Sequence, residues 1–269
     1  MDRIILHCDL NSFFASVELL SYPELRNQPV AVCGDPKSRH GIILAKNEPA
    51  KAKGVKTAET IWQAQRKCPN LVLLPSHHGL YREYSKKVNE IYYHYTDLVE
   101  PFGIDESWLD VTGTLHLFGG NARALADRIR TEIRETLGLT VSIGVSFNKV
   151  FAKLGSDYKK PDATTVITPE NVPQIVWPLP VSDLLFVGRS VRERLQKLGI
   201  RTIGDLAHAD PAELTQHLGK QGEQLYHYAR GEDRSPVAPA NEHTAPKSIG
   251  NGETFSHNIT GEHAVRGAL

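Results

Sequence analysis

FGIDESWLD, residues 102–110, sets two neighbouring carboxylates, Asp105 and Glu106, between two runs of strand-forming residues. Alternation along a strand sends neighbouring side chains to opposite faces, so one continuous strand would separate the two acids. The runs at 99–104 and 107–112 therefore indicate two strands joined by a hairpin, with the acid pair at its tip.

The sequence on either side predicts further strands and helices. Strands are expected at 3–10, 99–104, 107–112, 140–146 and 164–167, and helices at 81–98, 121–137, 148–160 and from Asn11–Ser12 onward. With residues 21–80 set aside as an insertion, the order is β-α-β-β-α-β followed by a helix and a strand. That order predicts an α+β fold of the split βαβ kind, whose third strand lies antiparallel between the first and the second.

This topology predicts that three acids meet at one edge of the sheet. Asp9 ends the first strand at the edge where the hairpin carries Asp105 and Glu106. Carboxylates held close together repel one another and favour a bound cation. Oxygen ligands suit Mg²⁺ or Mn²⁺, and two such ions can serve phosphoryl transfer. Asp110, further along the second hairpin strand, is expected to be a bystander.

Two helices could supply contacts to phosphate near these acids. The helix starting at Asn11–Ser12 would present free N–H groups just after the first strand, with Phe14 in its first turn. The helix at 148–160 carries Lys149, Lys153 and Lys160 on one side, where they form either a solvated face or a contact to a triphosphate. Lys160, at the helix end, is the best placed of the three.

The composition is that of a globular protein without membrane or disulfide signals. The chain has 269 residues, of which 40% are hydrophobic and 23% charged, and three cysteines without CxxC spacing. It has no apolar run of about 20 residues and no secretory signal at its start, so the cytosol is expected. Lys plus Arg and Asp plus Glu balance at 31 each, and overall charge does not indicate a nucleic-acid partner.

Four motifs resemble those of the Y-family DNA polymerases of the polymerase IV, or translesion, type. They are CDLNSFFASVE at 8–18, KTAETIWQAQRKCPNLVLLP at 56–75, GIDESWLD at 103–110 and SIGVSFNKVFAKLGSDYKKP at 142–161. The resemblance runs from residue 4 to about residue 255. It implies a βαββαβ palm (1–12 and 78–166), an inserted fingers subdomain (13–77) and a small all-helical thumb (167–233).

The resemblance implies roles for the residues at the acidic edge. Asp9, Asp105 and Glu106 match the family's catalytic, metal-binding carboxylates, and the carbonyl of Leu10 matches a further ligand. Two Mg²⁺ ions are the implied cofactor, with Mn²⁺ as a substitute.

It also implies contacts to the nucleotide. Phe14 matches the aromatic residue that excludes a ribose 2′-hydroxyl, and Phe13 would lie under the incoming nucleotide. Lys160 matches a lysine that binds the triphosphate.

The fingers depart from the family pattern. In LAKNEPAKAKGV (44–55), Ala45, Glu48 and Lys51 stand where the family has Thr, Tyr and Arg contacts to the triphosphate. Lys51 keeps the positive charge but lacks the arginine fork, and Glu48 opposes a phosphate, with Lys46 as a compensating cation.

The segment DLLFVGRSVRERLQKLGIRTIGDL (183–206) resembles a helix-hairpin-helix. Val191, Leu195 and Leu198 form the packed face of its second helix. Gly188 is expected to permit a tight turn that holds a DNA phosphate without reading sequence, with Ser190 where the family often has a second glycine.

The end of the chain resembles the start of another domain. Residues 234–246 read as a linker, and 247–269 resemble the beginning of the family's little-finger domain, so we expect this chain to be truncated. The peptide with which many relatives bind a sliding clamp is absent from it, although the full-length protein is expected to bind the clamp.

The function these features imply is template-directed, low-fidelity translesion DNA synthesis. The expected partners are primer-template DNA and dNTP, with no membrane, and the protein is expected to be a cytoplasmic monomer, associated with the nucleoid if bacterial. Two alternatives stay open. One is a polymerase-fold DNA-binding scaffold with weak or no activity, motivated by Ala45 and Glu48. The other is a nucleotide cyclase, which shares the palm-like core and the paired acids.

Overall fold

The structure is a computed structural model that describes residues 3–34, 41–239, 248–250, 252, 255 and 258–268. The chain forms two compact units, each described by itself. The first comprises Met1–Phe13 and His78–Ala240, and the second comprises Phe14–His77 and Asn241–Leu269.

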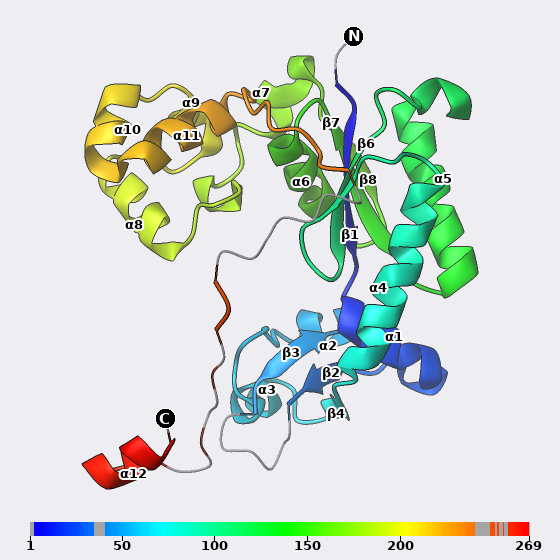
Figure 1. Cartoon of the computed structure of the whole chain (residues 1–269), viewed down its shortest axis with the longest axis vertical. Helices are drawn as coiled ribbons and strands as arrows, with labels where there is room; N and C mark the ends of the chain where they lie inside the picture. Colours follow the sequence, from blue (N-terminus) through cyan, green and yellow to red (C-terminus); the bar gives the residue numbers. More distant parts are fainter. Residues whose placement is uncertain are drawn as a thin grey trace. The chain divides into compact units, whose positions relative to one another are not determined.

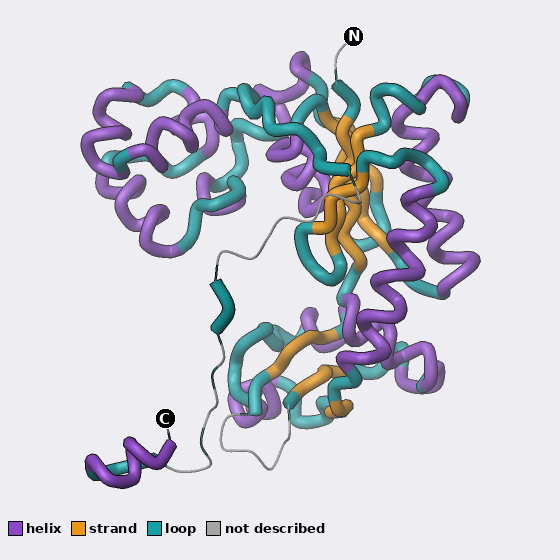
Figure 2. Tube along the Cα trace, viewed as in Figure 1, coloured by secondary structure: helices purple, strands orange, loops and turns teal. Residues whose placement is uncertain are grey.

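The first unit contains a five-stranded sheet with the order β5-β6-β1-β7-β8. Its strands are β1 (Ile5–Leu10), β5 (Val99–Pro101), β6 (Glu106–Asp110), β7 (Val141–Ser146) and β8 (Thr164–Val166). Figure 2 draws strands in orange and helices in purple. The predicted topology is confirmed, because β6 lies antiparallel between β1 and β5. On its other side β1 pairs antiparallel with β7, which pairs parallel with β8.

Helices cover both faces of this sheet. All residues of the central strands β1 and β7 are buried, as expected for strands covered on both sides. The covering helices are α4 (His78–Tyr93), α5 (Ala122–Leu137) and α6 (Lys149–Tyr158). Figure 1 shows α4 and α5 on one side of the sheet and α6 on the other. Residues of α5 at helical spacing, Leu125, Ile129 and Ile133, are buried as their pattern predicts.

The helix predicted at 81–98 is shorter at its end than the pattern indicates. It stops at Tyr93, because the side chain of Thr96 takes over the local hydrogen bonds. Thr96 Oγ1 donates to the carbonyl of Asp110 at 2.7 Å and accepts from the N–H of Leu98 at 3.2 Å. These bonds draw the chain out of the helix and into β5.

A close backbone contact fixes α6 against the sheet. A Cβ added to Gly144 of β7 would lie 1.9 Å from the carbonyl oxygen of Ala152 and 2.4 Å from the nitrogen of Ser156. Only glycine permits this approach, which determines the height at which α6 holds its lysines above the sheet.

The remainder of the first unit is helical. Its elements are η2 (Leu115–Phe118), η3 (Pro169–Asn171), α7 (Val172–Ile175), η4 (Val181–Asp183), α8 (Arg189–Lys197), α9 (Ile203–Ala207), α10 (Pro211–Leu218) and α11 (Lys220–Ala229). From α7 onward the helices share one hydrophobic core, which includes Leu195 and Leu214 and continues onto Phe151 and Leu154 of α6.

The helix-hairpin-helix turn has its left-handed residue at a position other than its glycine. Gly188 has φ −75° and ψ 178°, which any residue adopts, so its conformation does not require glycine. The left-handed residue of this turn is Phe186, with φ 68° and half of its surface exposed. Val191, Leu195 and Leu198 of the second helix do pack against the core, as their spacing predicts.

The second unit is built on a three-stranded sheet with the order β3-β2-β4. Its elements are α1 (Phe13–Ser21), η1 (Pro23–Leu25), β2 (Val30–Cys33), β3 (Ile43–Lys46), α2 (Glu48–Ala52), α3 (Ile61–Lys67), β4 (Val72–Pro75) and α12 (Glu262–Ala268). Ala31, Ile43, Ala64 and Leu71 belong to its core. In the whole chain Cys8, Cys33 and Cys68 are buried free thiols. Of the helices in the described segments, none combines the length and the apolar character needed to cross a membrane.

Candidate active site

The pairing of β1 with β6 brings acids from distant parts of the chain to one edge of the sheet. Asp9 lies directly opposite Glu106 in the antiparallel register. The N–H of Leu10 donates to the carbonyl of Asp105 at 3.0 Å, which ties the hairpin to the end of β1. Asp110 lies at the opposite end of the same ladder, where its Oδ1 accepts from the N–H of Thr112 at 3.0 Å.

Two lysines neutralise this acidic edge. Lys160 Nζ lies 2.7 Å from Asp9 Oδ2 and 2.6 Å from Asp157 Oδ1. Lys153 donates to Oε2 of Glu106. Lys153 lies in α6 and Lys160 in the loop after it. This part of the chain therefore supplies the positive charge that faces the acids of β1 and β6.

The surroundings raise the pKa of two of these acids and lower the pKa of the third. Burial raises the pKa of Asp9 to about 6, although the charge of Lys160 opposes the shift. Burial, together with the charge of Glu106, also raises the pKa of Asp105. Burial would raise the pKa of Glu106 as well, but its interactions with His7 and Lys153 outweigh burial and lower that pKa to about 2.

His7 lies beneath this edge as a fully buried residue of β1. Its Nδ1 is 2.8 Å from Ser156 Oγ, and that hydroxyl donates to the carbonyl of Lys153 at 2.8 Å. Burial lowers the pKa of His7, which leaves the ring neutral, and Nε2 lies 3.1 Å from Oε2 of Glu106. The geometry of this buried contact falls short of a hydrogen bond.

The donor atoms at this edge fit a hard divalent cation. Carboxylate and carbonyl oxygens are the ligands that Mg²⁺ and Mn²⁺ prefer, and a cation would relieve the repulsion by Glu106 that, after burial, raises the pKa of Asp105. Within the described part of the chain, no three His, Cys, Asp or Glu side chains stand together as a ready-made metal cluster. The reason is that Asp9 and Glu106 direct oxygens at Lys160 and Lys153.

Comparison with known proteins identifies the family of this chain. Residues 8–157, more than half of the chain, match the impB/mucB/samB family. The chain belongs to that family. Residues 182–233 match a second description, "DNA polymerase-iota, thumb domain".

Relatives of this impB/mucB/samB protein carry the name DNA polymerase IV. One from Acetivibrio thermocellus is 52% identical over 99% of this chain and 66% of its own length. Another, DNA polymerase IV 1 from Bacillus subtilis, is 43% identical over 99% of this chain and 64% of its own length. The chain thus spans slightly less than two thirds of these curated relatives.

Solved structures of Y-family polymerases share the fold. A Y-family DNA polymerase chimera of Dbh and Dpo4 has a TM-score of 0.81 and 28% identity, over 89% of this chain and 70% of its own. DinB from Sulfolobus solfataricus has a TM-score of 0.79 and 30% identity, over 87% of this chain and 69% of its own. The expected resemblance to the Y-family is confirmed by these matches.

The residues predicted to contact the nucleotide are divided between the two units. Phe13 is buried in the first unit, with its ring centroid 6.3 Å from that of Tyr81. Phe14 and Lys51 belong to the second unit, where Phe14 is half-buried and Lys51 is exposed. Lys51 Nζ lies 3.6 Å from Glu48 Oε1. The roles of these residues in nucleotide binding stay predictions.

Gly188 and Ser190, the predicted DNA contacts, lie at the start of α8. Both residues are exposed, and the carbonyl of Gly188 accepts from the N–H of Arg192 at 2.9 Å as the helix begins. The first turn of a helix leaves backbone N–H groups free to bind an anion, which suits a phosphate contact.

Three residues at the acidic edge were missed or underused by sequence reasoning. The sequence pattern places His7 in the first strand without giving it a role. It places Lys153 only among the three lysines on one side of the helix at 148–160. Asp157 was not considered, although it lies four residues after Lys153 and three before Lys160, spacings at which opposite charges meet on a helix. That spacing was the available signal.

Proposed function

We propose that this chain carries the catalytic part of a template-directed DNA polymerase that tolerates damaged templates. The observation that carries the proposal is the register of β1 and β6, which sets Asp9 opposite Glu106 with the Asp105 carbonyl bonded to Leu10. The names of the relatives support the same activity. In the reaction, the primer 3′-oxygen bonds to the α-phosphorus of a dNTP and pyrophosphate leaves.

The proposed cofactor is a pair of Mg²⁺ ions, for which Mn²⁺ would substitute. Asp9, Asp105, Glu106 and the carbonyl of Leu10 would hold them. When bound, such ions lower the pKa of an attacking hydroxyl and stabilise charge on the leaving oxygen. The chain's own lysines complete the site. Lys160, whose pKa is raised because Asp9 and Asp157 outweigh its burial, stays charged and suits a triphosphate.

The proposed partners are dNTP and primer-template DNA. One solved relative is titled an insertion ternary complex of Dbh DNA polymerase, at 29% identity. In this chain Gly188 and Ser190, at the start of α8, would hold a DNA phosphate, and Phe13, Phe14 and Lys51 would contact the nucleotide. We place the protein as a monomer in the cytoplasm, associated with the nucleoid if its source is bacterial, with a sliding clamp as a partner of the full-length protein.

Primer extension with dNTPs and Mg²⁺ tests the proposal. Asp105→Ala should reduce the rate by about 100-fold or more, because it removes one of the acids on which charge stabilisation depends. Asp110→Asn is the matched control, since Asp110 lies on the same strand at the far end of the ladder. Equal rates for wild type and Asp105→Ala would contradict the proposal.

One observation favours a second candidate, a DNA-binding scaffold with a weak nucleotide site. Lys51, the predicted triphosphate contact in the fingers, already faces an acid in Glu48. A chain that binds primer-template DNA but extends no primer, even when a little-finger domain is supplied, would favour the scaffold. Release of pyrophosphate from a nucleotide without DNA would instead favour the cyclase.

A further inference from the structure

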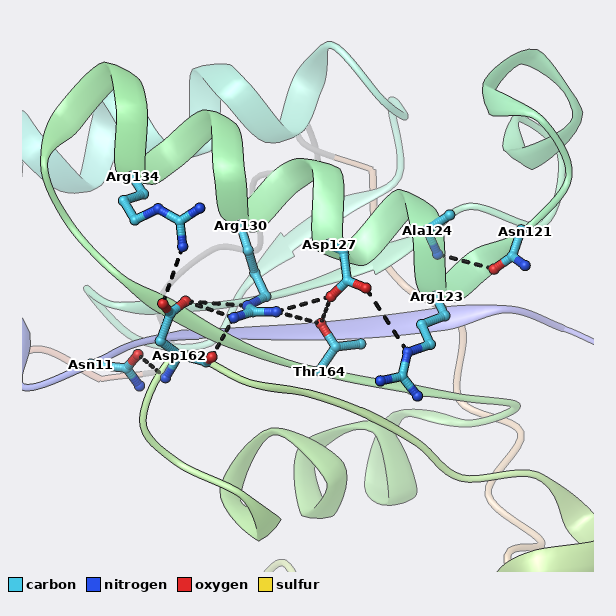
Figure 3. Close-up of polar contacts among 9 residues, drawn as sticks. All are labelled: Asn11, Asn121, Arg123, Ala124, Asp127, Arg130, Arg134, Asp162 and Thr164. Carbon is cyan, nitrogen blue, oxygen red and sulfur yellow. Dashed lines mark hydrogen bonds and ion pairs between the residues drawn. The ribbon is translucent and has the colours of Figure 1, made fainter.

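The turn that follows Lys160 contains a residue in the left-handed region, and hydrogen bonds hold it from two sides. Asp162 has φ 49°, in the left-handed region that residues other than glycine seldom adopt. Its main-chain N–H donates to Oδ1 of Asn11 at 2.8 Å, and Nδ2 of Asn11 donates to Ser142 Oγ at 2.8 Å. Figure 3 shows Asn11 in contact with Asp162, so the turn is tied to the residue that follows β1.

Arg130 of α5 binds Asp162 through both its main-chain carbonyl and its side chain. Its Nη2 donates to the carbonyl oxygen of Asp162 and, at 2.9 Å, to Oδ1 of that residue. Its Nη1 donates to Asp127 Oδ1 at 2.9 Å. Arg134 adds a contact of 3.3 Å from Nη1 to Oδ2 of Asp162. Figure 3 shows Arg130 between Asp162 and Asp127, with its guanidinium engaged on both sides.

This arrangement makes Arg130 a support rather than a substrate contact. Only 17% of its side chain is exposed, and its donors are already committed to Asp162, Asp127 and Thr164. A planar guanidinium can bind a carbonyl, a carboxylate and a second acid at once, whereas a lysine ammonium lacks that fork. Thr164 of β8 donates to Asp127 Oδ1 at 2.7 Å, so the second acid that Arg130 binds is itself held in place.

The support acts on a residue only two positions away. Lys160 leaves α6 on one side of the sheet, and Asp162 is held by α5 on the other. Between these two anchors the main chain has little freedom, and Nζ of Lys160 reaches Oδ2 of Asp9 at 2.7 Å. Releasing Asp162 would remove the anchor two residues after Lys160 and would leave the turn, and Lys160 with it, free to move.

We propose that Arg130 and Asp162 form a positioning pair, which holds Lys160 where its charge meets the triphosphate. The inference rests on the proposed polymerase function and adds to it two residues that act through Lys160. It predicts an effect on nucleotide binding rather than on DNA binding, because the contacts of both residues lie among α5, β8 and the end of β1.

Steady-state kinetics of primer extension test the pair. Arg130→Ala should raise KM for dNTP about tenfold, with the affinity for primer-template DNA unchanged. Arg130→Lys should not rescue it, because the fork is lost. Asp162→Asn, which keeps the carbonyl and one side-chain oxygen, should cost less. The control is Arg123→Ala on the same helix, because Arg123 contacts Asp127 at 3.9 Å and not Asp162.

A double mutant separates positioning from general damage. If Arg130 acts through Lys160, Arg130→Ala should cost nothing further in a Lys160→Ala background. Hydrogen exchange of the free protein gives a second readout, since Arg130→Ala should speed exchange of the Asp162 amide. An unchanged KM, or full additivity with Lys160→Ala, would overturn this inference alone. Wild-type protein that extends no primer would overturn the proposed function first, and this inference with it.

Discussion

Lys160 Nζ and Asp9 Oδ2 lie 2.7 Å apart, although the two residues are 151 positions apart in the sequence. The pair joins the loop after α6 to the end of β1. Asp9, a proposed metal ligand, and Lys160, a proposed phosphate ligand, therefore neutralise each other's charge. A nucleotide bound with its metal ions would supply each of them with a new partner, so we expect substrate binding to separate the pair.

The stability of the metal-free protein should depend on pH in a way that reveals Asp9. Its pKa rises from an ordinary 3.8 to about 6 in the folded protein, so between these values the folded state binds more protons than the unfolded state. The contribution of Asp9 to stability is therefore lost as pH rises, by on the order of 3 kcal/mol. We expect the free energy of unfolding of Asp9→Asn, relative to wild type, to increase from about pH 4 to about pH 7 in EDTA.

Glu106 should show the opposite sign. Its pKa falls from 4.5 to about 2 in the folded protein, so its stabilisation is present above the unfolded value and disappears as pH falls toward 2. Glu106→Gln should therefore lose stability at neutral pH and lose progressively less in acid. Denaturant unfolding at several pH values measures both variants. If the free energy of unfolding of the two variants, relative to wild type, changed with pH in the same direction, the two acids would not differ in environment.

Gly144→Ala should destabilise the first unit severely. The new methyl group would meet the backbone of α6 at Ala152 and Ser156, which cannot move without shifting Lys153 and its contact to Glu106. We expect a loss of about 3 kcal/mol, at the upper end for overpacking, together with weaker primer extension. Gly113→Ala is the control, because an added Cβ there meets nothing within 4 Å. If both variants unfold at the same denaturant concentration, the close approach of β7 and α6 is not a constraint.

Phe14→Ala should relax discrimination between deoxyribonucleotides and ribonucleotides. Removing a ring that blocks the 2′-hydroxyl should raise kcat/KM for a ribonucleotide roughly 10- to 200-fold relative to the deoxynucleotide, the range expected for steric exclusion in a pocket. Primer extension with each nucleotide in turn measures the ratio. An unchanged ratio would remove the assignment of Phe14 as the residue that selects the sugar.

Much of the sheet could be predicted because its signals are local. The acid pair in 102–110 interrupts an alternating pattern, and that interruption located the hairpin between β5 and β6. The order of helices and strands then restricted the topology, since few connections of a β-α-β-β-α-β chain bury both faces. The convergence of Asp9 with the hairpin follows from that topology alone.

The contacts that position the site were harder to foresee because they join distant elements. Arg130 and Asp162 are 32 positions apart and lie on a helix and a loop, so no local spacing links them. The conformation of the turn before α8 also has no signal in the sequence, because Phe186 adopts the left-handed region and Gly188 does not. The end of α4 was likewise set by Thr96 and Asp110, a contact between helix end and strand.

The central claim is tested most directly by a crystal structure of the protein soaked with Mn²⁺ and a non-hydrolysable dNTP. Anomalous diffraction locates manganese independently of any interpretation of the side chains. We expect manganese peaks among Asp9, Asp105 and Glu106, with Lys160 moved from Asp9 to the triphosphate. Manganese bound elsewhere, or Lys160 still paired with Asp9 while the nucleotide is bound, would contradict the account.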